Sequence, residues 1–135
     1  SWVLQKPGSI AAEYRTAIGD RIYGCDDCQD ACPISVRLGP RESIELDPSA
    51  DAWVDAIALL DADDDWIDQR YGHWYVTDRD FRWVRRNALV VIGNVAVPAD
   101  GRARSVVERY RAHIDPILAE HATWAAARLD ERAST

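Results

Sequence analysis

The stretch RDFRWVRRNALVVIGNV, residues 79–95, carries the strongest structural pattern in the chain. Its apolar residues recur at steps of three and four, the spacing of one face of an α-helix. They are Phe81, Val84, Ala88, Val91, Ile92 and Val95. Thr77 or Asp78 precedes the stretch and is expected to cap the helix. A helix with one apolar face must bury it against other elements, so residues 79–95 predict a helical core.

Outward from this helix, shorter helical patterns dominate and no convincing β pattern is found. We expect further helices at residues 9–18, 48–60, 66–71, 104–113 and 115–129, with nothing ordered beyond Leu129. Ser9 is the expected N-cap of the first, and Asp115-Pro116 the start of the last. Residues 36–46 contain Gly39-Pro40 and are expected to form a connecting loop. This pattern predicts a mainly α fold.

Two segments within the helical part look loosely alike. Residues 81–95 and 117–129 each contain an aromatic residue, an alanine-containing apolar stretch and an outer arginine. Their spacing is typical of a helical-hairpin repeat. We therefore expect two domains: residues 1–40, which hold all three cysteines, and a helical repeat domain over residues 41–135.

Composition excludes several classes of protein. The 135 residues are 47% hydrophobic and 29% charged, so a core can form. The net charge of -7 argues against nucleic-acid binding by bulk positive charge. No apolar run is long enough to span a membrane, and no secretory signal is visible, which favours a cytoplasmic protein. Methionine is absent, so we expect a processed or truncated piece of a longer chain.

Charge is unevenly distributed along the sequence. Residues 41–78 carry 2 basic and 11 acidic residues, whereas residues 79–135 carry 10 arginines and 7 acidic residues. Arg79, Arg82 and Arg86 follow steps of three and four, so they are expected to share one helix face. Such a stripe suits RNA phosphates. The alternative is that the arginines pair with the acidic residues of 61–68 within the fold.

The sharpest chemical signal is the segment CDDCQDACP, residues 25–33. Its C-x2-C-x3-C-P spacing places Cys25, Cys28 and Cys32 within one short turn. Thiolates are soft ligands for zinc or iron–sulfur clusters, and C-x3-C-P ends the cluster motif of bacterial ferredoxins. We therefore predict that these cysteines bind iron–sulfur clusters.

Two other interpretations of the cysteines stay open. Three cysteines with a distant histidine such as His73 are a known structural zinc set. Alternatively, all three are buried thiols without a ligand. Three ligands cannot complete a four-cysteine cluster, so an iron–sulfur site requires additional ligands before Ser1.

These residues resemble the epoxyqueuosine reductase family. The resemblance lies in Ser1-Trp2, in residues 7–10, most specifically in residues 19–33, and in Arg85–Leu89, Gly93-Asn94 and residues 121–129. It implies a partial ferredoxin-like [4Fe-4S] module followed by HEAT-like helical repeats. It also implies an oxidoreductase that depends on cobalamin and on two [4Fe-4S] clusters in the full-length protein, and that converts epoxyqueuosine to queuosine in tRNA.

The resemblance assigns roles to individual positions. Cys25 and Cys28 match ligands of the cluster nearer the cobalamin, and Cys32 matches a ligand of the other cluster. Ser1, Cys25 and Asp26 match positions near the corrin ring. Gln5 and Lys6 fall where the family approaches tRNA, and Arg79, Arg82 and Arg86 are the further candidate RNA contacts.

The resemblance also sets expectations for partners. The catalytic acid lies before Ser1, so this chain alone is expected to be inactive. The implied partners are the tRNA anticodon stem-loop and an external electron donor, and a monomer is expected. The rival interpretation is a non-enzymatic helical adaptor with a cysteine-rich zinc knuckle that binds RNA or protein.

Overall fold

A computed structural model describes residues 2–25, 27–38 and 53–135. These residues form α-helices and one 3₁₀ helix, with no strand in the described ranges, so the predicted mainly α fold is confirmed. The helices are α1 (Trp2–Gln5), α2 (Ala12–Ile18), α3 (Asp27–Asp30), α4 (Pro33–Leu38), α5 (Ala56–Asp61), α6 (Asp64–Tyr71), the 3₁₀ helix η1 (Thr77–Arg79), α7 (Arg82–Val95), α8 (Gly101–Arg111) and α9 (Pro116–Ala133). The expected boundary loop and Pro48-Ser49 lie largely outside the described residues.

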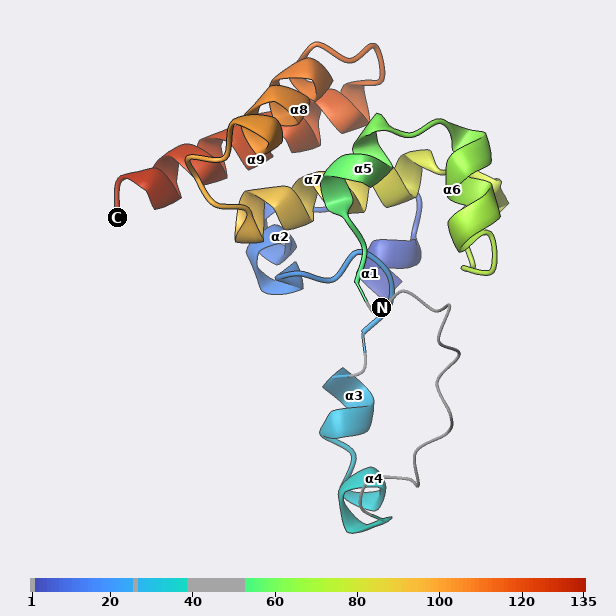
Figure 1. The fold of residues 1–135 in the computed structure, drawn as a ribbon. Coiled ribbons are helices and arrows are strands. Elements are labelled where there is room, and N and C mark those ends of the chain that lie inside the picture. The colour runs from blue at the N-terminus through green and yellow to red at the C-terminus, as the bar shows by residue number, and fades with distance from the viewer. Residues whose placement is uncertain (1, 26, 39–52) are drawn as a thin grey trace.

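Helix α7 is the centre of the fold. It runs through the middle of the molecule, with α8 and α9 on one side and α1 and α2 on the other (Figure 1). Almost every residue of α7 from Trp83 to Gly93 is buried, including polar ones. The apolar stripe predicted for α7 therefore describes only part of its buried surface, because a second face packs on the N-terminal segment.

A glycine permits the closest helix contact. At Gly93 of α7, an added Cβ atom would lie 2.9 Å from Cζ3 of Trp124 and 3.0 Å from Cα of Ala125, both on α9. Real Cβ atoms do not approach other atoms this closely, so only glycine lets α9 pack here. This contact joins the two segments that looked alike in sequence.

Aspartates start several of the helices. The side chains of Asp55, Asp63, Asp100 and Asp115 each accept a hydrogen bond from a backbone N–H in the first turn that follows, which satisfies an otherwise unpaired donor. The predicted start at Asp115-Pro116 is confirmed.

Several local predictions are wrong. Of the helix expected over residues 48–60, the described part begins only at Ala56. Ser9 does not cap α2; its hydroxyl instead donates to Glu120 at 2.7 Å, 111 positions away. The helix of residues 79–95 begins at Arg82, because Asp78 and Arg79 have positive φ angles that interrupt the helical path. Helix α9 continues past Leu129 to Ala133, where Arg132 donates to the carbonyls of Gly93 and Ala96 at the end of α7.

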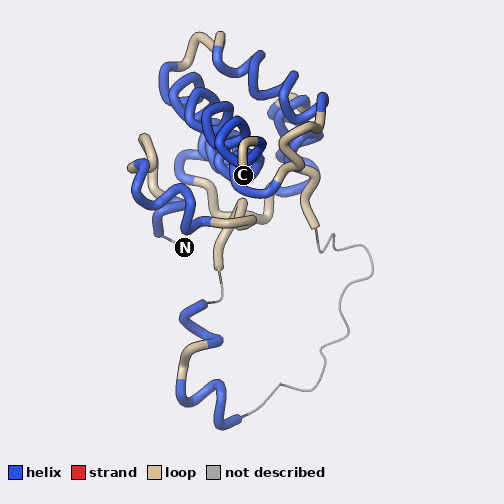
Figure 2. Tube along the Cα trace, turned by 90° about the vertical axis from the view of Figure 1, so that its left-hand side faces the viewer, coloured by secondary structure: helices blue, strands red, loops and turns tan. Residues whose placement is uncertain are grey.

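The two short helices next to the cysteines stand apart from this core. Helices α3 and α4 lie below the rest of the molecule in two views at right angles (Figures 1 and 2). The chain up to Ile22, in contrast, packs against α7. Ile22, three positions before Cys25, is therefore still part of the helical core.

Candidate functional site

The chain enters the cysteine segment from a firmly held position. Ile22 is 7% exposed and belongs to the main apolar core, and its carbonyl accepts a hydrogen bond of 2.9 Å from Asn87 Nδ2. Gly24 has φ +66°, in the left-handed region where glycine is favoured. The chain therefore turns at Gly24, immediately before the first cysteine.

The three cysteines flank and occupy α3. Cys25 precedes this helix and is half-buried, Cys28 lies within it and is exposed, and Cys32 follows it and is half-buried. The alternative of three buried thiols is therefore wrong for Cys28. Partly accessible thiols at one end of the fold have the chemistry that soft metals require.

The described residues do not by themselves form a complete metal site. Among them, no three Cys, His, Asp or Glu side chains are grouped so that they could hold a metal ion. This also applies to a zinc set that would combine the cysteines with His73, which lies edge-on to Trp74. The donor types fit an iron–sulfur site, and the geometry requires ligands from outside the described residues.

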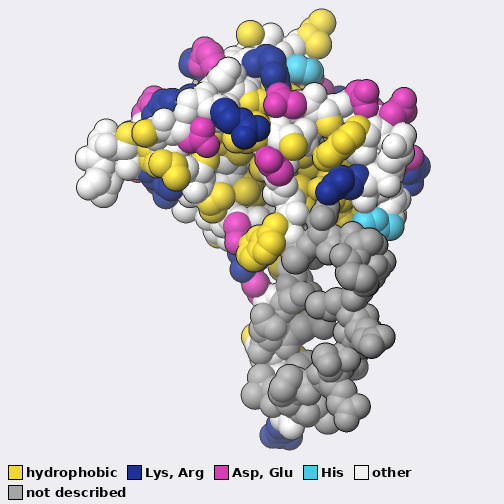
Figure 3. Space-filling model, in the orientation of Figure 1, with side chains coloured by type: hydrophobic (Ala, Val, Ile, Leu, Met, Phe, Trp, Pro, Cys, Tyr) yellow, Lys and Arg dark blue, Asp and Glu magenta, His cyan; other side chains and the backbone are white. Residues whose placement is uncertain are grey.

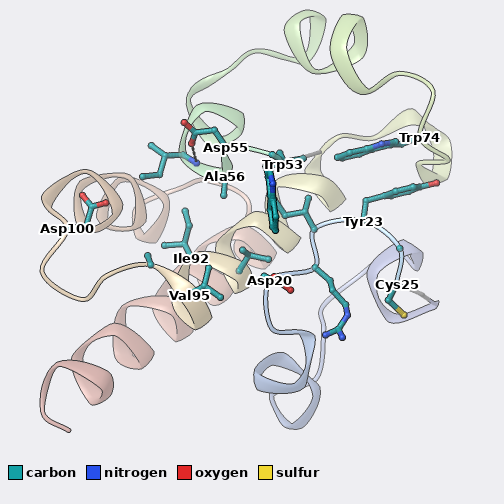
Figure 4. A pocket seen from close by; sticks show the side chains of 17 residues that line it. Asp20, Tyr23, Cys25, Trp53, Asp55, Ala56, Trp74, Ile92, Val95 and Asp100 are labelled. Carbon is teal, nitrogen blue, oxygen red and sulfur yellow. Dashed lines mark hydrogen bonds between the residues drawn. The ribbon is translucent and has the colours of Figure 1, made fainter. Parts of the chain in front are cut away.

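A cavity of about 1000 Å³ opens beside Cys25. Its walls are mostly apolar and come from the Tyr23 loop, α5 and the end of α7 (Figure 4). Trp53, Trp74, Ile92 and Val95 are among the lining residues, and so are two carboxylates, Asp20 and Asp100. Cys25 also lines a smaller cavity of about 190 Å³ formed with α1 and α2. Cys25 thus lies between two hollows of the surface.

One ion pair of the described residues lies beside the cysteines. Arg21 Nη2 lies 2.7 Å from Asp27 Oδ1, across the segment that contains Cys25. Both partners are exposed, so the pair adds little stability, although it links the two sides of the turn. Asp26, one of the residues expected near the corrin ring, lies outside the described residues, and so does Ser1.

The predicted arginine stripe is not a single surface, because Arg86 is completely buried. Its guanidinium donates to the carbonyls of Leu4 at 2.9 Å, Lys6 at 2.9 Å and Gly8. Burial, aided by the nearby charge of Arg15, lowers the pKa of Arg86 to about 10, so it stays charged at neutral pH. The prediction that Arg86 contacts RNA is therefore wrong, because every face of it is enclosed by the chain itself.

The remaining arginines of the stripe lie on the surface and are paired. Arg79 pairs with Asp68, while Arg82 bridges Asp80 and Asp115. Nearby, Arg85 pairs with Asp64 and Arg109 with Asp61. Basic and acidic side chains are accordingly interspersed on the face shown in Figure 3. The alternative of pairing with the acidic residues of 61–68 is confirmed for Arg79 and for the neighbouring Arg85, but it is wrong for Arg82, whose partners lie elsewhere.

The other candidate RNA contacts lie in and just after α1. The Gln5 carbonyl accepts a hydrogen bond of 3.0 Å from Thr77 Oγ1. The Lys6 ammonium lies 5.1 Å from the centre of the Trp2 ring, an exposed side chain. Both residues lie near the surface, and their backbone carbonyls are used by the fold.

Two amide side chains of α7 were missed by sequence reasoning. Asn87 Nδ2 donates to the carbonyls of Leu4 and Ile22, and Asn94 Nδ2 donates to those of Arg15 and Gly19. Together with Arg86 they form a polar seam that fixes the N-terminal segment on α7. The sequence does hold a signal for this seam, because Arg86 and Asn87 directly precede the apolar residues 88–92 of the same helix. Polar side chains that are buried with such a helix need hydrogen-bond partners.

This arrangement defines a helical protein whose N-terminal segment presents a cysteine-rich turn. No protein-family model matches the chain. It is 30% identical to epoxyqueuosine reductase of Shewanella oneidensis over 93% of this chain and 32% of that protein. It is also 32% identical to epoxyqueuosine reductase of Escherichia coli, over 96% of this chain and 34% of that protein.

Solved structures give the same result. A crystal structure of epoxyqueuosine reductase with an epoxyqueuosine-modified tRNA stem loop matches 98% of this chain and 35% of its own, with a TM-score of 0.78 and 26% identity. The resemblance to the epoxyqueuosine reductases is therefore confirmed over nearly the whole chain. The chain spans about a third of the length of the relatives it matches. In the described part of the chain, no helix has the length and apolar character needed to cross a bilayer.

Proposed function

We propose that this chain contributes a segment of an epoxyqueuosine reductase, the oxidoreductase that converts epoxyqueuosine to queuosine in tRNA. The observation that supports this most is the match to proteins of that name over 93–96% of the chain, with the same fold in a relative solved with a modified tRNA stem loop. The cysteine-rich turn adds chemistry of the expected type.

The cysteines are the proposed ligands of iron–sulfur clusters. In this proposal Cys25 and Cys28 hold one [4Fe-4S] cluster of a ferredoxin-like module, Cys32 contributes to a second, and other parts of the protein supply the remaining ligands. Cobalamin, near Ser1, Cys25 and Asp26, and the clusters would supply the low-potential electrons and the reductive step. The chain itself orients the thiols, because Ile22 and the turn at Gly24 fix where the segment starts.

The proposed substrate partner is the anticodon stem-loop of tRNA. Gln5 and Lys6 near the surface, and Arg79 and Arg82 with side chains 60% and 40% exposed, remain the candidate contacts. The Arg79–Asp68 pair does not prevent this, since an exposed pair contributes at most about 1 kcal/mol and a phosphate can replace a carboxylate. Arg82 would have to leave Asp80 or the less exposed Asp115 to contact a phosphate. The proposal also includes HEAT-like packing of α7, α8 and α9. It further includes an external electron donor, a cytoplasmic location and a monomeric state.

Metal analysis tests the proposal against the zinc-knuckle adaptor. The protein is expressed from its complete gene under anaerobic conditions, and iron, sulfide and zinc are measured. We expect about eight iron and eight sulfide per chain with broad visible absorption, and about half of that in Cys28→Ser. Ser105→Ala, at an exposed position on α8, is the matched control and should keep the full complement. Stoichiometric zinc without iron would contradict the proposal and support the adaptor.

A further inference from the structure

A stack of aromatic rings holds the residue two positions before Cys25. The rings of Tyr23 and Trp74 are parallel, with centroids 4.7 Å apart, and Trp74 stacks on Tyr71 at 4.4 Å. Figure 4 shows the Tyr23 and Trp74 rings lying face to face, with Cys25 further along the same loop. Stacked aromatic pairs contribute about 0.5–1.5 kcal/mol beyond burial of their area. The stack therefore restricts the position of Tyr23.

A hydrogen bond fixes the far end of the same ring. The Tyr23 hydroxyl accepts a hydrogen bond of 2.8 Å from the backbone N–H of Tyr75. Tyr71 is 6% exposed and lies in the main core, so the stack is anchored at its base. The segment between α6 and η1 thus holds the loop that leads to the cysteines, although Tyr75 lies 52 positions after Tyr23.

The hold on Tyr23 matters because the next residue, Gly24, has no side chain that could pack against the core. Gly24 has φ +66° and nothing lies within 4 Å of where its Cβ would be, so no contact of a side chain restrains the turn. Contacts on both sides of Cys25 help to set its position: those of Ile22 and Tyr23 before it, and the Arg21–Asp27 pair around it. The aromatic stack acts on Tyr23, two positions before Cys25. The Arg21–Asp27 ion pair is solvent-accessible and therefore a weaker restraint.

We propose that Trp74 is a positioning residue for the cysteine segment: by stacking on Tyr23 it holds Cys25 where a metal cluster needs its thiolate. This role rests on the proposed function, since it presupposes that Cys25 binds a cluster. Trp74 acts through Tyr23 and does not itself coordinate metal. Groups that orient metal ligands from outside the coordination sphere typically change metal affinity about 10- to 100-fold when they are removed.

Release of iron from the reconstituted protein tests the role of Trp74. The wild-type protein, expressed from its complete gene, is loaded with iron and sulfide anaerobically, and loss of visible absorption is followed after addition of an iron chelator. We expect Trp74→Ala to lose iron about tenfold faster and Trp74→Phe, which keeps a stacking ring, to release it at close to the wild-type rate. Trp53→Ala is the matched control, because Trp53 lines the same cavity but is 83% exposed.

The outcomes separate the two levels of the proposal. If the wild type binds no iron, the proposed function and the role of Trp74 are both wrong. If the wild type binds iron and folded Trp74→Ala releases it at the wild-type rate, only the positioning role is wrong. Should Trp74→Ala not fold, Tyr23→Leu removes the other ring of the stack, and an unchanged release rate in that folded variant would overturn the role.

Discussion

Replacing Arg86 by methionine removes a buried charge while keeping a long, flexible side chain. In the native protein four acceptors depend on this guanidinium: the carbonyls of Val3, Lys6 and Gly8, and Asn87 Oδ1, which Nε and Nη2 contact at 3.1 and 2.8 Å. The Leu4 carbonyl keeps a second donor, Asn87 Nδ2. The variant therefore leaves four acceptors without this donor, mostly at the junction between α1 and α7.

The magnitude follows from opposing effects. Hydrogen bonds to charged groups contribute about 1.5–3 kcal/mol each, so the loss alone would reach several kcal/mol. Removal of a fully buried cation recovers part of its desolvation penalty, which is substantial here because burial is what lowers its pKa. We expect Arg86→Met to lower the free energy of unfolding by about 2–4 kcal/mol.

Urea unfolding measures this change, and hydrogen exchange locates it. Exchange should accelerate most in residues 2–22, which the polar seam of α7 fixes, and less in α8 and α9. Arg102→Met, at an exposed position on α8, is the matched control and should change stability by less than about 0.5 kcal/mol. An equally small effect for Arg86→Met would refute the role assigned to the seam.

Two further results are expected for the core. His121 is fully buried; its Nδ1 contacts the Ile117 carbonyl at 2.7 Å, and its Nε2 accepts from the Ile10 N–H at 3.2 Å. Burial lowers its pKa to about 4, whereas an unfolded histidine titrates near 6.5, so the unfolded state binds more protons between these values. The free energy of unfolding should therefore fall by about 3 kcal/mol as the pH drops from 6.5 to 4. Urea unfolding at several pH values measures this change, and His121→Gln should make the free energy of unfolding less dependent on pH. The same pH dependence in the variant and the wild type would be inconsistent with a neutral native His121. In α7, Gly93→Ala should destabilise by about 1–3 kcal/mol because its Cβ would collide with α9, whereas Gly101→Ala, with open space around it, should be neutral or slightly stabilising in thermal melts. A Gly93→Ala protein as stable as the wild type would contradict the close approach.

Periodicity predicted the helices well where one apolar face decides the structure. Helix α7 and the start of α9 at Asp115-Pro116 follow from local rules of spacing and capping, which act within one or two turns. The mainly α fold followed from the same rules. These features need no knowledge of what the helices pack against.

Long-range partners explain the predictions that were wrong. Arg86 was placed on the surface because arginine is usually exposed, yet the carbonyls of the N-terminal segment enclose it. Ser9 bonds to Glu120 rather than capping its own helix. For the cysteines, spacing predicts how the thiols follow one another along the chain, but completion of a site depends on ligands that no local pattern can place.

The most direct test of the central claim is nucleoside analysis of tRNA. The protein, expressed from its complete gene and reconstituted anaerobically with iron, sulfide and cobalamin, is incubated with a chemical reductant and tRNA that carries epoxyqueuosine, and the digested nucleosides are identified by mass spectrometry. We expect epoxyqueuosine to be converted to queuosine, and we expect Cys28→Ser to abolish the conversion while Ser105→Ala does not. Unchanged epoxyqueuosine in the presence of a fully loaded wild-type protein would contradict the proposed function.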